Sequence, residues 1–107
     1  MRLWKQALTN IVLQKGPDLS TRQLSVMFIV YLEQKQHTVR RLAAAIDVSK
    51  SVITRYIDTL SILGLVKRVR DEKDKRNIFI TRTVKGAVFL ADFAAMIEKS
   101  NEETRET

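Results

Sequence analysis

Residues 47–64 read DVSKSVITRYIDTLSILG, a stretch that predicts an amphipathic helix over residues 50–63. Ser49 has the short side-chain oxygen that caps free backbone N–H groups at a helix start, and Gly64 can take the left-handed conformation that ends a helix. At about 100° per residue, the apolar side chains share one half of this helix. The side chains expected to face the core are Val52, Ile53, Tyr56, Ile57, Leu60 and Leu63.

The other half of this helix is polar and basic, with Lys50, Ser51, Thr54, Arg55, Asp58 and Thr59. Hydroxyls and cations can donate hydrogen bonds to phosphates and base edges, and Arg55 can pair in a bidentate manner with guanine O6 and N7. Most polar helix faces are simply solvated, so this face does not by itself establish a binding function. The neighbouring segments decide between the two interpretations.

A second, shorter helix is predicted just before residue 47. Thr38 can cap it, and its inward side chains are Val39, Leu42, Ala43 and Ile46. Asp47 and Val48 then form a tight turn into the longer helix, which gives a helix-turn-helix pattern. The first helix of such a motif crosses the DNA backbone, so Arg40 and Arg41 are expected to contact phosphates.

A β-hairpin is predicted directly after Gly64. Segments 65–70 and 77–82 are rich in β-branched and aromatic residues and flank the charged run 71–76. A hairpin in this place is a wing, whose cations can enter the minor groove or lie along phosphates, although a solvated turn with ordinary ion pairs is the commoner meaning of such a run. The expected contacts come from Lys67, Arg68, Arg70, Lys73, Lys75 and Arg76, within a basic wing over 67–82.

Three further segments complete the predicted fold. A helix over 2–15 ends at Gly16, and its apolar stripe packs in the core or against a second subunit. Ser20 and Gln23 form a capping box that opens another helix. The apolar face expected for that helix is Leu24, Met27, Phe28, Tyr31 and Leu32.

The last predicted helix covers residues 84–99, with Thr83 as its cap and Gly86 permitting close approach of a neighbour. It is apolar almost all round, and a chain of 107 residues is too small to cover every side. We therefore expect the terminal helices 2–15 and 84–99 to form a homodimer. The polar tail 100–107 is expected to fray.

Composition narrows the possible functions. The whole chain, 1–107, is expected to form a single domain, and its net charge is +7. Between residues 50 and 85 there are ten Lys or Arg against four acids, a basic middle that attracts polyanions. No signal peptide or membrane-spanning run is recognisable, so we expect a cytoplasmic, nucleoid-associated protein with no membrane partner.

Enzymatic chemistry is not expected. The chain has no Cys, a single histidine, His37, in a loop, no glycine-rich phosphate loop and no acid pair in a catalytic setting. We expect His37 at the surface rather than on a metal, and no metal or other cofactor.

A family resemblance rests on residues spread from Ser20 to Leu90. The motifs are Leu42-Ala43, Val48-Ser49-Lys50-Ser51, Thr54-Arg55, Leu60, Gly64-Leu65-Val66, Asp74-Lys75-Arg76, Thr83 and Gly86. Together they resemble the MarR family of winged-helix transcriptional regulators. The resemblance implies a mainly α (α+β) winged helix-turn-helix fold with about five helices and a two- or three-stranded wing.

The resemblance also implies roles for individual residues. Ser51, Thr54 and Arg55 would enter the major groove of a pseudo-palindromic operator, with Lys50 near the backbone, and Arg76 would reach the minor groove, oriented by Asp74. Ser49 belongs to the same motif and is included among the DNA-binding candidates.

Two features depart from the family pattern. Arg82 stands where family members usually carry an apolar strand residue, so the end of the hairpin is expected to pack differently. The chain is also shorter than typical members, which leaves no expected small-molecule effector.

The sequence therefore predicts a regulator that binds double-stranded DNA, as a homodimeric repressor. Two alternatives remain open. One is an architectural DNA-binding protein with little sequence preference, and the other is a winged helix used as a protein-interaction module.

Overall fold

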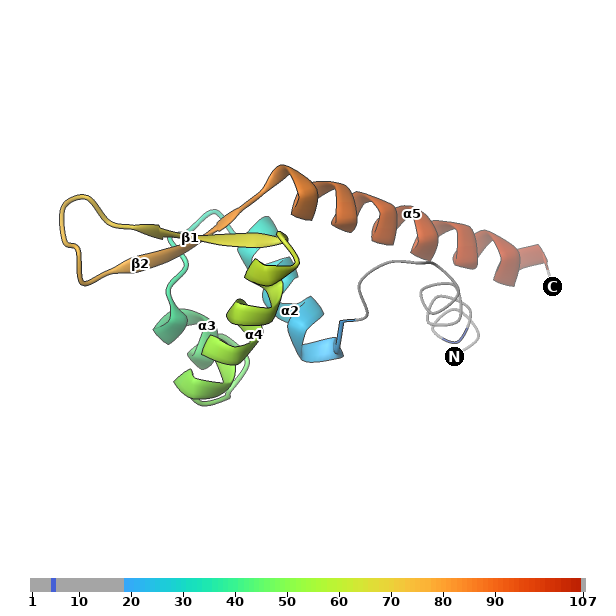
Figure 1. Ribbon diagram of the computed structural model, residues 1–107. Helices are drawn as coiled ribbons and strands as arrows, with labels where there is room; N and C mark the ends of the chain where they lie inside the picture. The colour runs from blue at the N-terminus through green and yellow to red at the C-terminus, as the bar shows by residue number, and fades with distance from the viewer. Residues whose placement is uncertain (1–4, 6–18, 107) are drawn as a thin grey trace. The chain divides into compact units, whose positions relative to one another are not determined.

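The helix expected over residues 50–63 is present as α4, Lys50–Ile62, in the computed structural model, which describes residue 5 and residues 19–106 (Figure 1). The described elements are α2 (Thr21–Leu32), α3 (Val39–Ala45), α4, β1 (Val66–Arg70), β2 (Ile78–Arg82) and α5 (Val84–Glu106). Four helices and a two-stranded antiparallel hairpin make a mainly helical winged helix-turn-helix, which confirms the predicted fold class. The helix predicted over 2–15 lies outside the described residues, apart from Lys5.

Contacts group the chain into two compact units. One unit is Leu19–Ala87, which carries every described element up to the first turn of α5. The other contains residues 88–107 together with residues 1–18. The organisation as a single domain stays a prediction. Along the described helices, none is both long and apolar enough to cross a bilayer.

Local capping signals begin each helix of the first unit at the expected residue. The Ser20 hydroxyl accepts from the backbone N–H of Gln23, whose side chain accepts in return from the Ser20 N–H. Thr38 and Ser49 cap α3 and α4 in the same way. These bonds satisfy N–H groups that have no partner within the helix.

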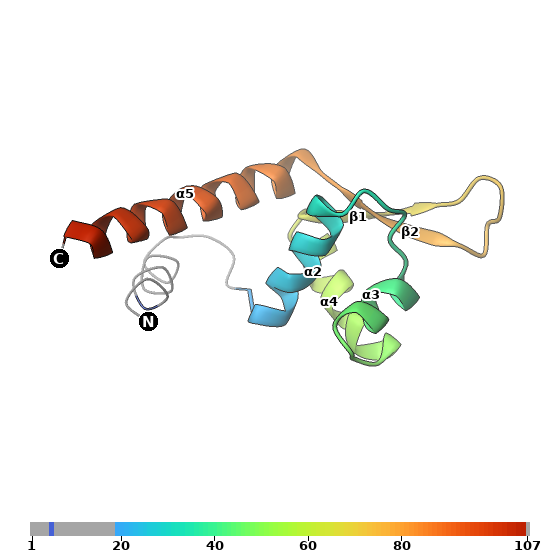
Figure 2. The same ribbon diagram turned by 180° about the vertical axis from the view of Figure 1, so that it is seen from behind.

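The helix-turn-helix is joined at Asp47, which has a φ of 53°. The Val48 N–H donates to the Ala43 carbonyl at 3.0 Å, closing the turn. Figures 1 and 2 both show α3 beside α4, as the expected motif requires.

The core of this unit lies between α2, α3, α4 and the base of the hairpin. Its fully buried apolar side chains are Val26, Met27, Val30, Leu42, Ile53, Ile57, Leu60, Leu65, Val66 and Ile80. The face predicted for α2 was partly wrong, because Leu32 is 72% exposed while Val26 and Val30 are buried. Leu32 lies about 200° round the helix from Val30 and so points away from the core.

The wing is a regular hairpin in which Val66 pairs with Arg82 and Arg70 pairs with Ile78. His37 adds a single bridge to this sheet, since its carbonyl accepts from the Ile80 N–H at 2.8 Å. The prediction of a surface His37 was wrong, because only 6% of the residue is exposed. The bridge holds His37 against the edge of the sheet, and its ring Nε2 lies 2.9 Å from the Glu33 carbonyl oxygen.

Helix α5 begins at the expected cap, because the Thr83 hydroxyl accepts from the Gly86 N–H at 2.9 Å. The helix continues to Glu106, so the end predicted at residue 99 was placed too early, and the fraying of the tail stays a prediction. After Gly86 no Gly or Pro interrupts the chain, and the Glu, Lys and Arg residues near its end favour helix.

Candidate nucleic-acid interface

The outward half of α4 is an exposed polar surface. Lys50, Ser51, Thr54 and Arg55 are all exposed, while Ile53, Ile57 and Leu60 anchor the opposite half in the core. A helix fixed through its apolar side presents its polar side as a rigid set of donors. Such a set can match phosphate oxygens and base edges in a major groove.

Ser49 has a different local role from its neighbours on α4. Its hydroxyl accepts from the Val52 N–H at 3.3 Å and lies 3.1 Å from the Ser51 hydroxyl. The capping bond therefore uses the hydroxyl of Ser49, a residue that was predicted to contact DNA. Ser49 is exposed, so its contact with DNA stays a prediction.

The two arginines at the start of α3 are exposed. Arg41 donates through Nη1 to the Gln36 carbonyl at 3.4 Å, which turns it toward the preceding loop. Both belong to the unit that contains α4 and the wing, so one compact unit carries all the predicted DNA-contacting residues.

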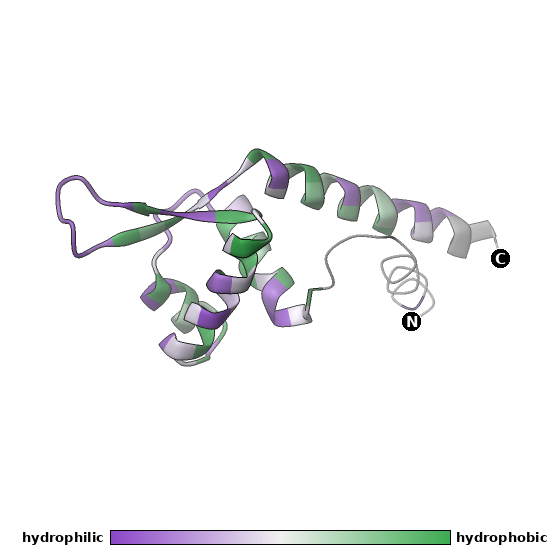
Figure 3. Ribbon diagram, in the orientation of Figure 1, coloured by the Kyte–Doolittle hydropathy of each residue, from purple (hydrophilic) through white to green (hydrophobic). Residues whose placement is uncertain are grey.

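The wing tip is ordered by its own acids. The Asp71 carboxylate accepts from the Lys73 N–H at 2.9 Å, and the Asp74 carboxylate accepts from the Arg76 N–H at 3.1 Å. The hairpin projects beyond the helices, and its tip is hydrophilic (Figure 3). All the cations of the hairpin are exposed to solvent: Lys67, Arg68, Arg70, Lys73, Lys75, Arg76 and Arg82.

Asp74 also holds the side chain of Arg76. The guanidinium donates from Nε to Oδ1 at 3.1 Å and from Nη2 to Oδ2 at 3.2 Å, while the Arg76 side chain remains 90% exposed. The bidentate pair fixes the direction of the arginine and leaves much of it open to a ligand. The family resemblance implied that Asp74 orients Arg76 toward the minor groove, and that contact with DNA stays a prediction.

The Arg76 guanidinium beside Asp74, helped by the Arg76 backbone N–H, holds the pKa of that carboxyl below its usual value of 3.8, against a small opposing effect of desolvation. Because this pKa is lowered in the folded state, the ion pair's contribution to the stability of the fold is complete when the pH is above the usual pKa of the carboxyl. The contribution is lost as the pH falls through the lowered pKa. The arrangement of the wing tip is therefore intact at neutral pH.

We expect the Asp74 carboxyl to titrate below pH 3.8, and Arg76→Ala to raise its midpoint toward that value. The substitution removes the guanidinium that favours the charged carboxylate. Carboxyl ¹³C chemical shifts recorded against pH in both proteins give the two midpoints. Identical midpoints would show that the pair does not form in solution.

Arg68 differs from the other wing cations. Its Nη2 donates to Oδ1 of Asp58 on α4 at 2.5 Å, so Arg68 contacts α4 rather than projecting freely from the hairpin. Sequence reasoning placed Asp58 on the outward face of α4 without identifying this partner. The contact depends on how β1 packs against α4, and no local sequence pattern reports that packing.

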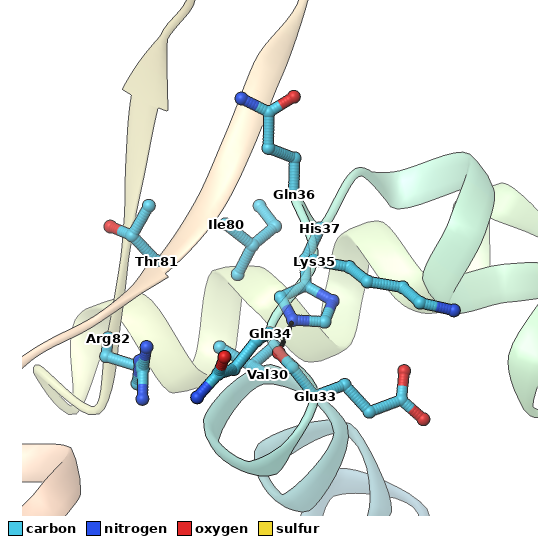
Figure 4. Close-up of a pocket in the computed structure, with 9 residues that line it drawn as sticks. All are labelled: Val30, Glu33, Gln34, Lys35, Gln36, His37, Ile80, Thr81 and Arg82. Atoms are coloured by element: carbon cyan, nitrogen blue, oxygen red, sulfur yellow. Dashed lines mark hydrogen bonds between the residues drawn. The ribbon is translucent and has the colours of Figure 1, made fainter.

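A pocket of about 460 Å³ lies behind the base of the wing (Figure 4). His37 is on its wall, and Arg82 donates from Nη1 to the Tyr31 carbonyl at 3.3 Å. Figure 4 shows the side chains of Lys35, Gln36 and Arg82 pointing in different directions rather than converging on one point. Among the described residues, no group of three His, Asp or Glu could hold a metal ion.

These features define a winged helix-turn-helix protein with an exposed basic recognition helix and wing. The MarR family profile matches residues 19–78, which is more than half of the chain. The chain belongs to the MarR family of winged helix-turn-helix transcriptional regulators. This membership confirms the expectation of a regulator rather than an enzyme.

Known proteins similar to the chain include regulators and solved structures. Over 60 residues it is 37% identical to the HTH-type transcriptional regulator BilQ of Clostridium symbiosum, covering 55% of this chain and 42% of that protein. The chain thus spans less than half the length of this curated relative.

Two solved structures share the fold. A mutant of S. aureus MepR bound to an oligodeoxyribonucleotide has a TM-score of 0.82 at 17% identity, covering 98% of this chain and 75% of that one. CouR from Rhodococcus jostii RHA1, bound to p-coumaroyl-CoA, has a TM-score of 0.69 at 26% identity, covering 94% and 66%.

Proposed function

We propose that this protein is a sequence-specific transcriptional regulator that binds double-stranded DNA as a homodimer and acts as a repressor. The observation that carries the proposal is the exposed polar half of α4, displayed in the same compact unit as the Asp74-oriented Arg76. The MepR structure with a bound oligodeoxyribonucleotide has the same fold, which supports this proposal.

In this proposal α4 lies in the major groove. Arg55 pairs with guanine through its planar guanidinium, and the hydroxyls of Ser51 and Thr54 hydrogen-bond base edges, while the methyl group of Thr54 contacts a T methyl group. Lys50, at the helix start, neutralises a phosphate. These side chains are exposed and need no rearrangement of the core to meet DNA.

The wing and α3 supply the contacts outside the major groove. Arg76 enters the minor groove, where a narrow A·T-rich segment concentrates negative potential. Lys67, Arg70, Lys73 and Lys75 lie along the backbone, and Arg40 and Arg41 contact phosphates beside α4. The positive charge of this unit supports the proposal that the protein is associated with the nucleoid.

Two copies are needed for the proposed operator. A two-fold dimer reads two half-sites about one helical turn apart, and the apolar side chains of α5 provide a surface for the second copy. Val88 on α5 is 53% exposed in the single chain. Repression follows if the bound dimer covers a promoter, and the proposal includes no small-molecule effector.

A titration onto two duplexes tests the proposal. One duplex carries the DNA upstream of the coding region or a site selected from random sequence, and the other is a scramble of the same composition. We expect a preference of roughly 10³ or more at physiological salt, a log K against log salt slope of about −0.9 per phosphate neutralised, and two chains per duplex at saturation.

Other outcomes would favour the alternatives. Equal and steeply salt-dependent affinity for a selected site and its scramble would indicate an architectural protein. Absence of binding to either duplex would indicate a protein-interaction module, for which the exposed Val84 and Val88 on α5 are candidate contacts.

A further inference from the structure

The contact between Asp58 and Arg68 joins the recognition helix directly to the wing. Arg68 is paired across the hairpin with Ile80, which is 1% exposed, so its side chain leaves the sheet on the face that packs toward the helices. There its Nη2 donates to Asp58 Oδ1, and the two side chains are 34% and 53% exposed. Arg68 therefore points toward α4 and away from the solvent beyond the tip.

The outer part of the hairpin has little other support among the described residues. Val66 and Ile80 are buried at its base, whereas Val69 and Ile78 are each 40% exposed. A two-stranded hairpin is only marginally stable by itself. An ion pair at the level of Ile80, where the buried base ends, can therefore restrict the angle between the wing and α4.

Asp58 also lies on the polar half of α4, one turn beyond Thr54 and Arg55. On the proposed DNA-facing side, an unpaired carboxylate would repel phosphates. Arg68 neutralises this charge locally, so the pair combines wing attachment with removal of an unfavourable charge.

We propose that Asp58 and Arg68 are positioning residues that set the angle of the wing relative to α4 and thereby the reach of Arg76 into the minor groove. The inference rests on the proposed function, and it replaces the predicted phosphate contact of Arg68 with a structural role. Arg76 remains the wing residue that touches DNA.

The substitution Asp58→Asn distinguishes the positioning of the wing from electrostatic repulsion between Asp58 and the DNA phosphates. Removing an acid near phosphates would by itself tighten binding, but loss of the wing angle is expected to weaken operator binding roughly two- to fivefold. Glu72→Gln is the matched control, because Glu72 is an exposed acid on the wing. Its substitution is expected to tighten binding slightly. Tighter binding by both variants would overturn the positioning role.

The salt dependence of Arg68→Gln provides an independent measurement. If Arg68 only positions the wing, Arg68→Gln and Asp58→Asn are expected to change the slope of log K against log salt equally, because both displace the same wing cations. A slope smaller in magnitude by about 0.9 in Arg68→Gln than in Asp58→Asn would show that Arg68 neutralises a phosphate and would contradict the proposal.

A double-mutant cycle with Arg76→Ala tests the consequence at the minor groove. Arg76→Ala is expected to cost less affinity in the Asp58→Asn background than in the parent, because a displaced wing already loses that contact. Additive effects would mean that Asp58 does not act through the wing.

A measurement without DNA keeps this inference separate from the proposed function. The chain has no Cys, so Ala45→Cys on α3 and Lys75→Cys on the wing give two spin-label sites, both exposed and in the same unit. We expect the distance distribution between the labels to broaden in Asp58→Asn and in Arg68→Gln. An unchanged distribution would overturn the positioning role even if the parent binds its operator, and a parent that fails to select an operator would refute only the proposed function.

Discussion

Gly86→Ala is expected to lower the free energy of unfolding by about 2–3 kcal/mol, as for a close-packed site forced to accept a new methyl group. A Cβ at residue 86 would collide with the Tyr31 hydroxyl and with the Leu65 carbonyl oxygen. These atoms are not free to move, because the Tyr31 hydroxyl donates to the Leu65 carbonyl at 2.5 Å and accepts from the Thr83 N–H at 3.0 Å. Urea unfolding followed by circular dichroism measures the loss.

Gly64→Ala is the matched control for this substitution. Gly64 has a φ of +76°, but a Cβ there would meet only the flexible side chain of Lys85. Its expected cost is the backbone strain alone, about 1 kcal/mol. Equal losses for the two glycines would show that the close approach at Gly86 is not a constraint in solution.

Arg55→Ala is expected to weaken binding to the selected operator by about 1–3 kcal/mol and to relax the preference at one base pair. The exposed Arg55 guanidinium on α4 can donate two parallel hydrogen bonds to one guanine, which the methyl group of alanine cannot replace. Fluorescence anisotropy with operators that differ at single positions measures both effects.

Two further variants separate sequence reading from charge. Arg55→Lys keeps the positive charge and loses the planar pair of donors, so the preference for one base pair should fall more than the affinity for DNA. Arg22→Ala removes the same charge from an exposed position on α2 outside the candidate interface and should change binding little. An Arg55→Ala protein that binds the operator as tightly as the parent would contradict the placement of α4 in the major groove.

Capping residues made the element boundaries predictable from sequence. The side chains of Ser20, Thr38 and Ser49 each accept a hydrogen bond from the backbone N–H three positions later. Such a contact can be predicted from the local sequence alone. The exposed side of α4 was predictable for a similar reason, because the helix repeat alone separates it from Ile53 and Ile57.

The side chains that were misplaced all have partners distant in the sequence. The bridge between His37 and Ile80 buries a histidine that loop composition placed at the surface. Arg68 was grouped with the other wing cations because its partner Asp58 lies ten residues away on another element. The apolar face of α2 was misplaced because Val26, rather than Leu32, turns toward the core that the other elements create.

The hydroxyl of Thr83 connects the end of one helix to the beginning of another. It donates to the Gly64 carbonyl at 2.7 Å, just beyond α4, and accepts from the Gly86 N–H in the first turn of α5. A single side-chain oxygen therefore joins the segment after α4 to the first turn of α5. In the proposed dimer, the helix that meets the second copy would begin at the residue that is hydrogen-bonded to the end of the helix that meets DNA.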